Sequence, residues 1–357
     1  IEQPDGSRFH ALTKGDEWHN RTETLEGYTI QQSDDGYWYY VEGYVDDKAM
    51  LSASRADIPP VTILPKHVKP DKLPEKLLNK ANGDKLSKAP VGSFSGPILF
   101  ILAQFTDIAG STTEASWSSF ITNNIIDYFN KTSRGKITLT PASESFGTIN
   151  NGVVGWVNLD YDHPDTSDNT DQRNQKLAKD AVLAANSYVN FSTYDKNHDG
   201  YVDADELAVV IVVAGYERSY SGNYHPSVWG HQWSIGQVSP PVVDGVTVGS
   251  YHSGTGGYAQ FGELHRSTSG DQHQATMGIM VHELGHLIFN LPDLYDTDFS
   301  SSGIGAFCLM SYGSWGKSST DTWSGQTPVL ASAWVRHHLG WDSSTEVMLA
   351  TVPSTLV

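Results

Sequence analysis

The chain has 357 residues, with 41 Asp and Glu against 23 Lys and Arg, so its net charge is −18 at pH 7. That length allows two or three domains, and the negative charge excludes nucleic acid and anionic membrane surfaces as partners. No apolar run approaches the roughly 18 residues that cross a bilayer, and a single cysteine, Cys308, excludes an internal disulfide.

The first predicted unit is residues 1–64, which are rich in Gly, Tyr and Trp with frequent turn signals such as Asp34-Asp35-Gly36. This pattern predicts a small β-rich domain built of hairpins. Residues 65–95 follow, where seven lysines between 66 and 88 alternate with prolines and the apolar pattern is poor. We expect a linker there, and an exposed lysine-rich stretch of this kind is also a natural cleavage site.

The remaining residues, 96–357, alternate between strand and helix patterns, which is typical of an α/β or α+β fold. Strands are predicted at 97–105, 135–141 and 206–214, and helices at 117–132 and 171–189. The stretch 215–270 is rich in Gly, Ser and Tyr and looks irregular. We expect this part to form one catalytic domain around a central sheet.

An acidic loop before the predicted strand 206–214 has the ligand spacing of a calcium site. Positions 1, 3, 5, 7, 9 and 12 of such a loop offer oxygen ligands, and position 6 is a glycine, here Gly200. Because a strand follows instead of a helix, we expect a structural loop-strand calcium site and not an EF-hand. Its expected ligands are Asp195, Asn197, Asp199, Tyr201 through its carbonyl, Asp203 and Glu206.

The run Met277 to Asp296 places two histidines and a glutamate where a helix would make a catalytic zinc site. His282 and His286 are four residues apart, so on a helix both imidazoles lie on one face and can bind one metal ion. Glu283 then lies beside the metal, where a general base can take a proton from a water molecule. The apolar residues around them predict a buried helix.

A catalytic zinc site needs a third protein ligand. Asn290 tolerates the left-handed conformation that ends many helices, and Leu291-Pro292 then turns the chain, so Asp293 can return to the metal. Asp296 in the same segment is the alternative ligand, and Glu263 is a more distant one.

The segment Cys308-Leu309-Met310-Ser311-Tyr312 resembles the methionine turn beneath the zinc of metzincins, with Met310 as its floor. HELGHLIFNLPDLYD resembles their HExxHxxGxxH/D motif with one extra residue and Asn for Gly. TPVLASAWVRHHLGW and PILFILAQFTD narrow the similarity to the immune inhibitor A-type family of secreted bacterial metalloproteases. QPDGSRF and GDEWHNRTETLEGYTI resemble the propeptide of that family, so the similarity extends over most of the chain.

The resemblance implies a zincin-type metalloprotease domain, with a mixed sheet, an active-site helix and a Met-turn, behind a propeptide. It also implies that Tyr312 ligates zinc or hydrogen-bonds the oxyanion, and that the protein is secreted and extracellular. We therefore expect a monomeric zinc endopeptidase proform that hydrolyses proteins or peptides, with zinc as catalytic and calcium as structural cofactor.

Two other functions remain open: a zinc hydrolase of small amides, and a catalytically silent calcium-stabilised adhesion or binding module. If the chain is a proform, residues 1–64 are expected to block the cleft until the linker is cleaved. A cysteine switch is excluded because Cys308 lies beside Met310 in the catalytic half. The segment Gly15 to Asn20, which combines carboxylates, an imidazole and Trp18, is the favoured blocking element.

Overall fold

The computed structural model describes residues 1–15, 20–33, 35–45, 48–69, 94–167, 169–221, 224–252, 255–296, 301 and 303–343. Most of the predicted cleavage stretch 66–88 and the core of the predicted blocking segment, residues 16–19, therefore lie outside the described residues. Among the described residues, no helix is both long and apolar enough to cross a membrane.

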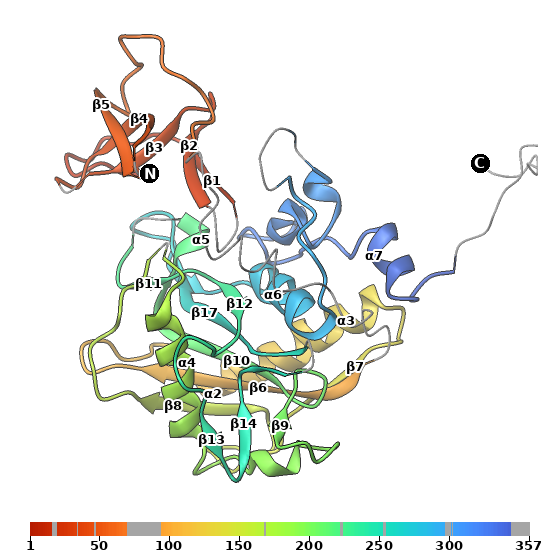
Figure 1. The fold of residues 1–357 in the computed structure, drawn as a ribbon. Coiled ribbons are helices and arrows are strands. Elements are labelled where there is room, and N and C mark those ends of the chain that lie inside the picture. Colours follow the sequence, from red (N-terminus) through yellow and green to blue (C-terminus); the bar gives the residue numbers. More distant parts are fainter. Residues whose placement is uncertain are drawn as a thin grey trace, which may run out of the picture.

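The N-terminal region is β-rich, as the sequence predicts (Figure 1). Its five strands pair in sequence order, each antiparallel to the next. They are β1 (Ala11–Gly15), β2 (Asn20–Thr24), β3 (Thr29–Gln32), β4 (Trp38–Val45) and β5 (Lys48–Arg55). A small apolar cluster of Ile30, Trp38, Tyr40, Ala56 and Leu64 lies on this sheet. Lys69 is the last described residue before the gap at 70–93.

The second region is built on a mixed sheet in the order β12-β17-β10-β6-β7. Strands β6 (Ser95–Gln104), β7 (Thr138–Pro141), β10 (Ala208–Glu217) and β17 (Tyr258–His265) are parallel, whereas the edge strand β12 (His231–Trp233) is antiparallel. Three short strands extend it: β8 (Val153–Asn158) on β6, β11 (Ser227–Val228) on β10 and β18 (His273–Gln274) on β17.

Both faces of this sheet are buried, because successive side chains of a strand point to opposite sides. In β6, Ile98, Phe100 and Leu102 pack into one apolar cluster, and Leu99, Ile101 and Ala103 pack into the other. The first cluster includes residues of α2 (Glu114–Phe120), η1 (Ile121–Ile126), α3 (Asp127–Thr132) and α6 (Met277–Phe289). The second includes residues of α4 (Gln172–Ala185).

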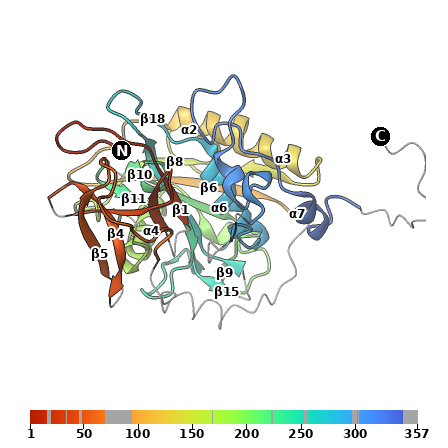
Figure 2. The same ribbon diagram turned by 90° about the horizontal axis from the view of Figure 1, so that it is seen from above.

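The predicted helix at 117–132 is a continuous row of α2, η1 and α3, which runs along one side of the molecule in Figure 2. Its middle turn, η1, has π-helical geometry. Thr113 begins the row because its hydroxyl accepts a hydrogen bond from the Ser116 amide. Asp171 begins α4 in the same way through the Arg173 amide.

Smaller elements connect these layers. They are η2 (Phe191–Thr193), β9 (Tyr201–Val202), α5 (Arg218–Ser221), β13 (Val242–Val243), β14 (Val246–Val248), β15 (Tyr251–His252), β16 (Thr255–Gly256), η3 (Gly305–Phe307), η4 (Tyr312–Trp315) and α7 (Ala333–His338). The N-terminal sheet contacts this second region where β1 approaches α5 (Figure 1). The observed fold is thus a β-rich region followed by a mixed α/β domain.

Candidate metal centre

Helix α6 carries the two histidines on a buried scaffold. Eleven of its thirteen residues are buried, because apolar side chains surround the helix on nearly all sides. Asn290 ends the helix in the left-handed conformation, with φ 51° and ψ 36°, and its amide donates to the carbonyls of Gly285 and His286. The turn that the sequence predicts at this residue is therefore present, and it reverses the chain toward the helix.

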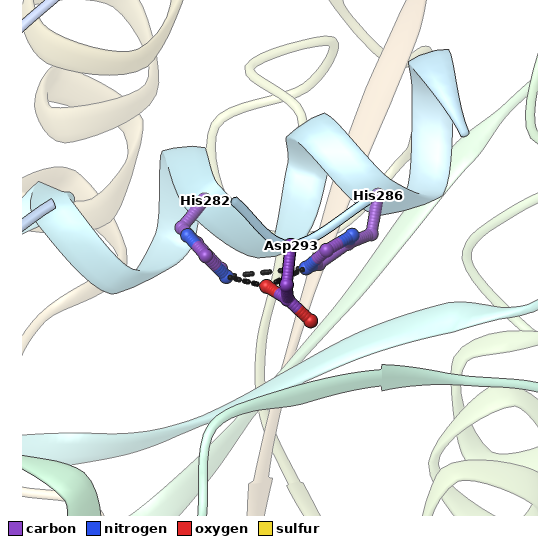
Figure 3. A group of neighbouring side chains, drawn as sticks. All are labelled: His282, His286 and Asp293. Atoms are coloured by element: carbon purple, nitrogen blue, oxygen red, sulfur yellow. Dashed lines mark hydrogen bonds and ion pairs between the residues drawn. The ribbon is translucent and has the colours of Figure 1, made fainter. Parts of the chain in front are cut away.

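The reversal brings Asp293 against both imidazoles (Figure 3). Asp293 Oδ1 lies 3.1 Å from His282 Nε2 and 3.1 Å from His286 Nε2. The two Nε2 atoms are themselves 3.1 Å apart. The three side chains are 7%, 11% and 16% exposed, so the group is nearly closed to solvent but still reachable.

The contacts of the other ring nitrogens fix the tautomer that each imidazole has when it is neutral. His282 Nδ1 donates to the Leu309 carbonyl at 2.9 Å, and His286 Nδ1 donates to the Leu291 carbonyl at 2.5 Å. A carbonyl only accepts, so each Nδ1 carries a proton, and the neutral form of each imidazole presents the lone pair of Nε2. In that neutral form, two lone pairs and a carboxylate oxygen converge on one point, which is favourable only with a cation between them.

The charges of these groups shift their pKa values in opposite directions. Burial lowers the pKa of His286, but the charge and hydrogen bond of Asp293 outweigh it, so the net shift is upward. Burial would raise the pKa of Asp293, and the imidazoles instead hold it well below its usual range. Asp293 is thus an anion, and its negative charge is stabilised by positive charge nearby. The donor set fits a divalent metal of the zinc type.

Glu283 follows His282 on the helix and is 1% exposed. The segment around Met310 packs beneath this turn of α6. A Cβ on Gly285 would lie 2.7 Å from Met310 Sδ, so the methionine sulfur rests where only glycine leaves room. Leu294, the residue after Asp293, donates to the Met310 carbonyl at 2.7 Å. Together with the Leu309 carbonyl, these contacts hold the helix, the Asp293 turn and the 308–312 segment together.

Tyr312 is half-buried at the start of η4, two residues beyond Met310. Burial raises its pKa, and the charges of Arg21, Glu23 and Asp296 also act on it. Its ring stacks at 6.4 Å on Tyr295, which is buried two residues after Asp293. Tyr312 is therefore a neutral phenol that can donate a hydrogen bond at pH 7.

The two alternative third ligands have other contacts. Asp296 Oδ2 accepts from the Ser301 amide at 2.5 Å, as a loop carboxylate does. Glu263 Oε1 accepts from the amides of Ser111 and Thr112 and from the Ser111 hydroxyl. Of the three candidates, the structure brings only Asp293 to the histidine pair in the part of the chain that it describes.

In the acidic loop 195–206, two carboxylates accept hydrogen bonds from backbone amides of the same loop. Asp195 accepts from the amides of Asp199 and Gly200, and Gly200 has a positive φ of 87°. Glu206 accepts from the amides of Lys196, Asn197 and Asp203. The carboxylates of Asp199 and Asp203, instead, come together with an imidazole from elsewhere in the chain.

That imidazole belongs to His252, which sequence reasoning did not connect with the loop. His252 Nδ1 lies 3.3 Å from Asp199 Oδ2 and 3.9 Å from Asp203 Oδ2, and its ring stacks on Tyr201 at 3.9 Å. His252 lies in β15, about fifty residues beyond the loop, and no local spacing relates the two. Strand β14 pairs with β9 of the loop, and this pairing brings His252 close to Asp199 and Asp203. A prediction of that strand pairing would have been needed to find the contact.

The chain was also compared with known protein families. Residues 114–342 match the family model described as Immune inhibitor A peptidase M6, catalytic domain. The matched range includes α6, Asp293 and the segment 308–312. No curated protein matches the chain.

Proposed function

Since this chain belongs to the immune inhibitor A peptidase M6 family, we propose that it is a secreted, zinc-dependent endopeptidase made as a proform. The observation that carries the proposal is the convergence of two Nε2 lone pairs and the Asp293 carboxylate at 3.1 Å, with both Nδ1 protons held by carbonyls. Three protein ligands are the number that catalytic zinc sites use, and they would leave a further coordination position of the metal to water or substrate.

His282, His286 and Asp293 would hold the zinc. When bound, zinc lowers the pKa of a water molecule to about 7 and polarises the peptide carbonyl. Glu283, the buried carboxylate next to His282, takes the proton from the attacking water and delivers it to the leaving amine. Tyr312 keeps its proton at neutral pH, so its hydroxyl can donate to the carbonyl oxygen as negative charge develops there.

A casein digestion assay tests this function. The full chain is loaded with zinc, treated with limited trypsin and then freed of trypsin activity with an inhibitor. We expect hydrolysis that a zinc chelator abolishes and added zinc restores. Hydrolysis that survives the chelator would refute the metallopeptidase mechanism. Turnover of small amides without casein cleavage would favour a small-amide hydrolase, and no turnover of either would favour a silent binding module.

The domain division belongs to the same proposal: a propeptide at 1–64, a cleavable linker at 65–95 and a catalytic domain at 96–357. The N-terminal strand β2 carries a buried ion pair, with Arg21 Nε 2.6 Å from Glu23 Oε1. The side chains are 5% and 0% exposed, and their charges reach the Tyr312 phenol. Residues of β2 are therefore within electrostatic range of Tyr312, which supports a propeptide near the candidate centre.

Calcium binding by the loop 195–206 is a further part of the proposal. Asp195, Asn197, Asp199, Asp203 and Glu206 would bind through side-chain oxygens and Tyr201 through its carbonyl. The support is that the carboxylates of Asp199 and Asp203 approach each other and His252 in a partly buried place. Such a group is stabilised by a cation.

A further inference from the structure

Three rings from distant parts of the chain meet near the start of α6. Tyr220 lies on α5, His265 ends β17 and Trp315 ends η4. The Tyr220 ring stacks on His265, with centroids 4.1 Å apart and 18° between planes, and its centroid is 5.9 Å from that of Trp315. His265 is buried, whereas Tyr220 and Trp315 are partly exposed. The two partly exposed rings therefore form one aromatic surface.

Buried polar contacts hold this surface in place. Glu217, the last residue of β10, is 1% exposed, and its Oε1 accepts from the hydroxyl and the amide of Ser219 at 2.7 and 3.0 Å. These bonds fix α5 at the residue before Tyr220. The Thr276 amide donates to His265 Nδ1 at 3.3 Å, so the ring behind Tyr220 is fixed as well. Burial lowers the pKa of His265 well below its usual value, so this imidazole is neutral at pH 7.

The Trp315 end of this surface lies at the metal-binding face of α6. Gly278 precedes His282 by four residues, so the two share one face of the helix and are about 6 Å apart along its axis. A Cβ on Gly278 would overlap the Ser314 carbonyl oxygen, so η4 packs against that face. A Cβ on Gly325 would lie 3.4 Å from Trp315 Cε3 and 3.6 Å from Gly278 Cα. Trp315 is therefore near Gly278, about one helical turn from His282.

Trp315 also shares a face of η4 with Tyr312. In a 3₁₀ helix, side chains three residues apart project from the same side. Tyr312 and Trp315 are the first and last residues of η4 and both are partly exposed, whereas Gly313 and Ser314 between them are buried. A peptide whose carbonyl reaches the Tyr312 hydroxyl therefore passes close to Trp315.

The N-terminal sheet approaches both ends of the same surface. Strand β1 contacts α5, which carries Tyr220 (Figure 1). The charges of Arg21 and Glu23 in β2 act on the Tyr312 phenol. Under the proposed function this sheet occupies the substrate side of the proform, so α5 and Tyr312 both belong to that side.

We propose that Tyr220 and Trp315 form a substrate subsite for an aromatic side chain, phenylalanine or tyrosine, within three residues of the scissile bond. The inference rests on the proposed endopeptidase function. An extended peptide advances about 3.3 Å per residue, so one helical turn from His282 corresponds to about two residues of substrate. The substrate ring packs against the exposed parts of the two rings. The charge of Asp271 acts on the Tyr220 phenol and disfavours an acidic side chain there.

The test is a cleavage profile of the zinc-loaded full chain after limited proteolysis, with the activating protease inhibited and only chelator-sensitive cleavage counted. Peptides carry Phe, Tyr, Gln or Glu at each of three positions on both sides of one bond. We expect kcat/KM to favour Phe and Tyr over Gln, and Gln over Glu, at one of these positions. Tyr220→Ala should reduce the preference for Phe over Gln about three- to tenfold, and Trp315→Leu should also reduce it. Tyr220→Phe keeps the ring and should retain the preference.

Trp334→Ala is the matched control, because Trp334 is a 48% exposed aromatic side chain on a different element, α7, where it stacks on His338. It should leave the profile unchanged. Equal kcat/KM for Phe and Gln at every position, or a preference that both Tyr220→Ala and Trp315→Leu leave intact, would overturn the subsite.

Absence of chelator-sensitive cleavage of all peptides would instead overturn the proposed function. Binding to the zinc-loaded, proteolysed Glu283→Ala chain tests the subsite without turnover. The Phe peptide should bind more tightly than the Gln peptide, and Tyr220→Ala in the same chain should remove the difference. Equal binding of the two peptides would count against the subsite whether or not the chain is a peptidase.

Discussion

Asp293 and Asp296 stand three residues apart in one loop, yet their carboxylates have different surroundings. Asp293 is held between two imidazoles, whereas Asp296 accepts a hydrogen bond from the Ser301 amide. The sequence alone left this choice open, because both aspartates follow the same Leu291-Pro292 turn. Two backbone features place Asp293, and not Asp296, at the histidines: the left-handed conformation of Asn290, and the hydrogen bond from the Leu294 amide to the Met310 carbonyl.

We predict different effects for alanine substitutions of Asp293 and Asp296. Asp293→Ala should lower zinc content and zinc affinity by ten- to a hundredfold or more, because one of three ligands is lost. Asp296→Ala should leave zinc content close to one per chain, because the histidine pair is grouped with the carboxylate of Asp293 and not with that of Asp296. Both are measured by elemental analysis after dialysis against a weak chelator. If the two results are reversed, Asp296 is the third ligand.

Gly285 shows how one element depends on the absence of a side chain. A Cβ there would meet Met310 Sδ at 2.7 Å, and Met310 adjoins Leu309, whose carbonyl holds His282. We predict that Gly285→Ala displaces Met310, lowers the free energy of unfolding by about 1–3 kcal/mol and weakens zinc binding.

Thermal unfolding and zinc competition check this prediction. Gly270→Ala is its control, because a Cβ on Gly270 meets nothing within 4 Å. Equal behaviour of the two variants would show that the packing of Met310 against α6 has no role in holding the metal.

The acidic loop gives a second prediction at the level of one element. A calcium-selective chelator that leaves zinc in place should lower the Tm and speed proteolysis, because the carboxylates lose their counter-charge. Asp199→Ala should abolish the response of Tm to calcium. Asp205→Ala should preserve it, since Asp205 is exposed and adjacent to the loop ligands without being one of them. If the Tm of the unchanged chain does not depend on calcium, the loop is a solvated acidic turn and not a calcium site.

The elements that the sequence predicts well are those whose pattern is apolar and local. β6, β10 and the row from α2 to α3 lie where their apolar runs place them, within a few residues at each end. Strand β17 was missed, because it lies inside the stretch 215–270 that looks irregular. All eight of its residues are buried, but Gln260, Glu263 and His265 among them are polar. Their partners, such as Asn174 for Gln260 and Ser111 for Glu263, are distant in sequence.

At the scale of the whole molecule, charged residues of β2 in the N-terminal sheet act electrostatically on Tyr312 of the second region. We predict that residues 1–88, expressed separately and added to a 90–357 chain, inhibit its protease activity in a dose-dependent way. The reason is that the charges of Arg21 and Glu23 act on the Tyr312 phenol. Replacement of both by alanine should weaken that inhibition, measured as the IC50 in a casein assay. No inhibition by excess unchanged fragment would leave the N-terminal region as a folding aid only.

The central claim is that the metal is held without Glu283 while the chemistry needs it. The most direct test measures zinc content and casein turnover together in the Glu283→Ala chain. We predict one zinc per chain, as in the unchanged protein, and a loss of turnover of at least about a hundredfold, because no base takes the proton from water. Loss of zinc in step with loss of activity, or full activity with zinc bound, would contradict the assignment of roles at this site.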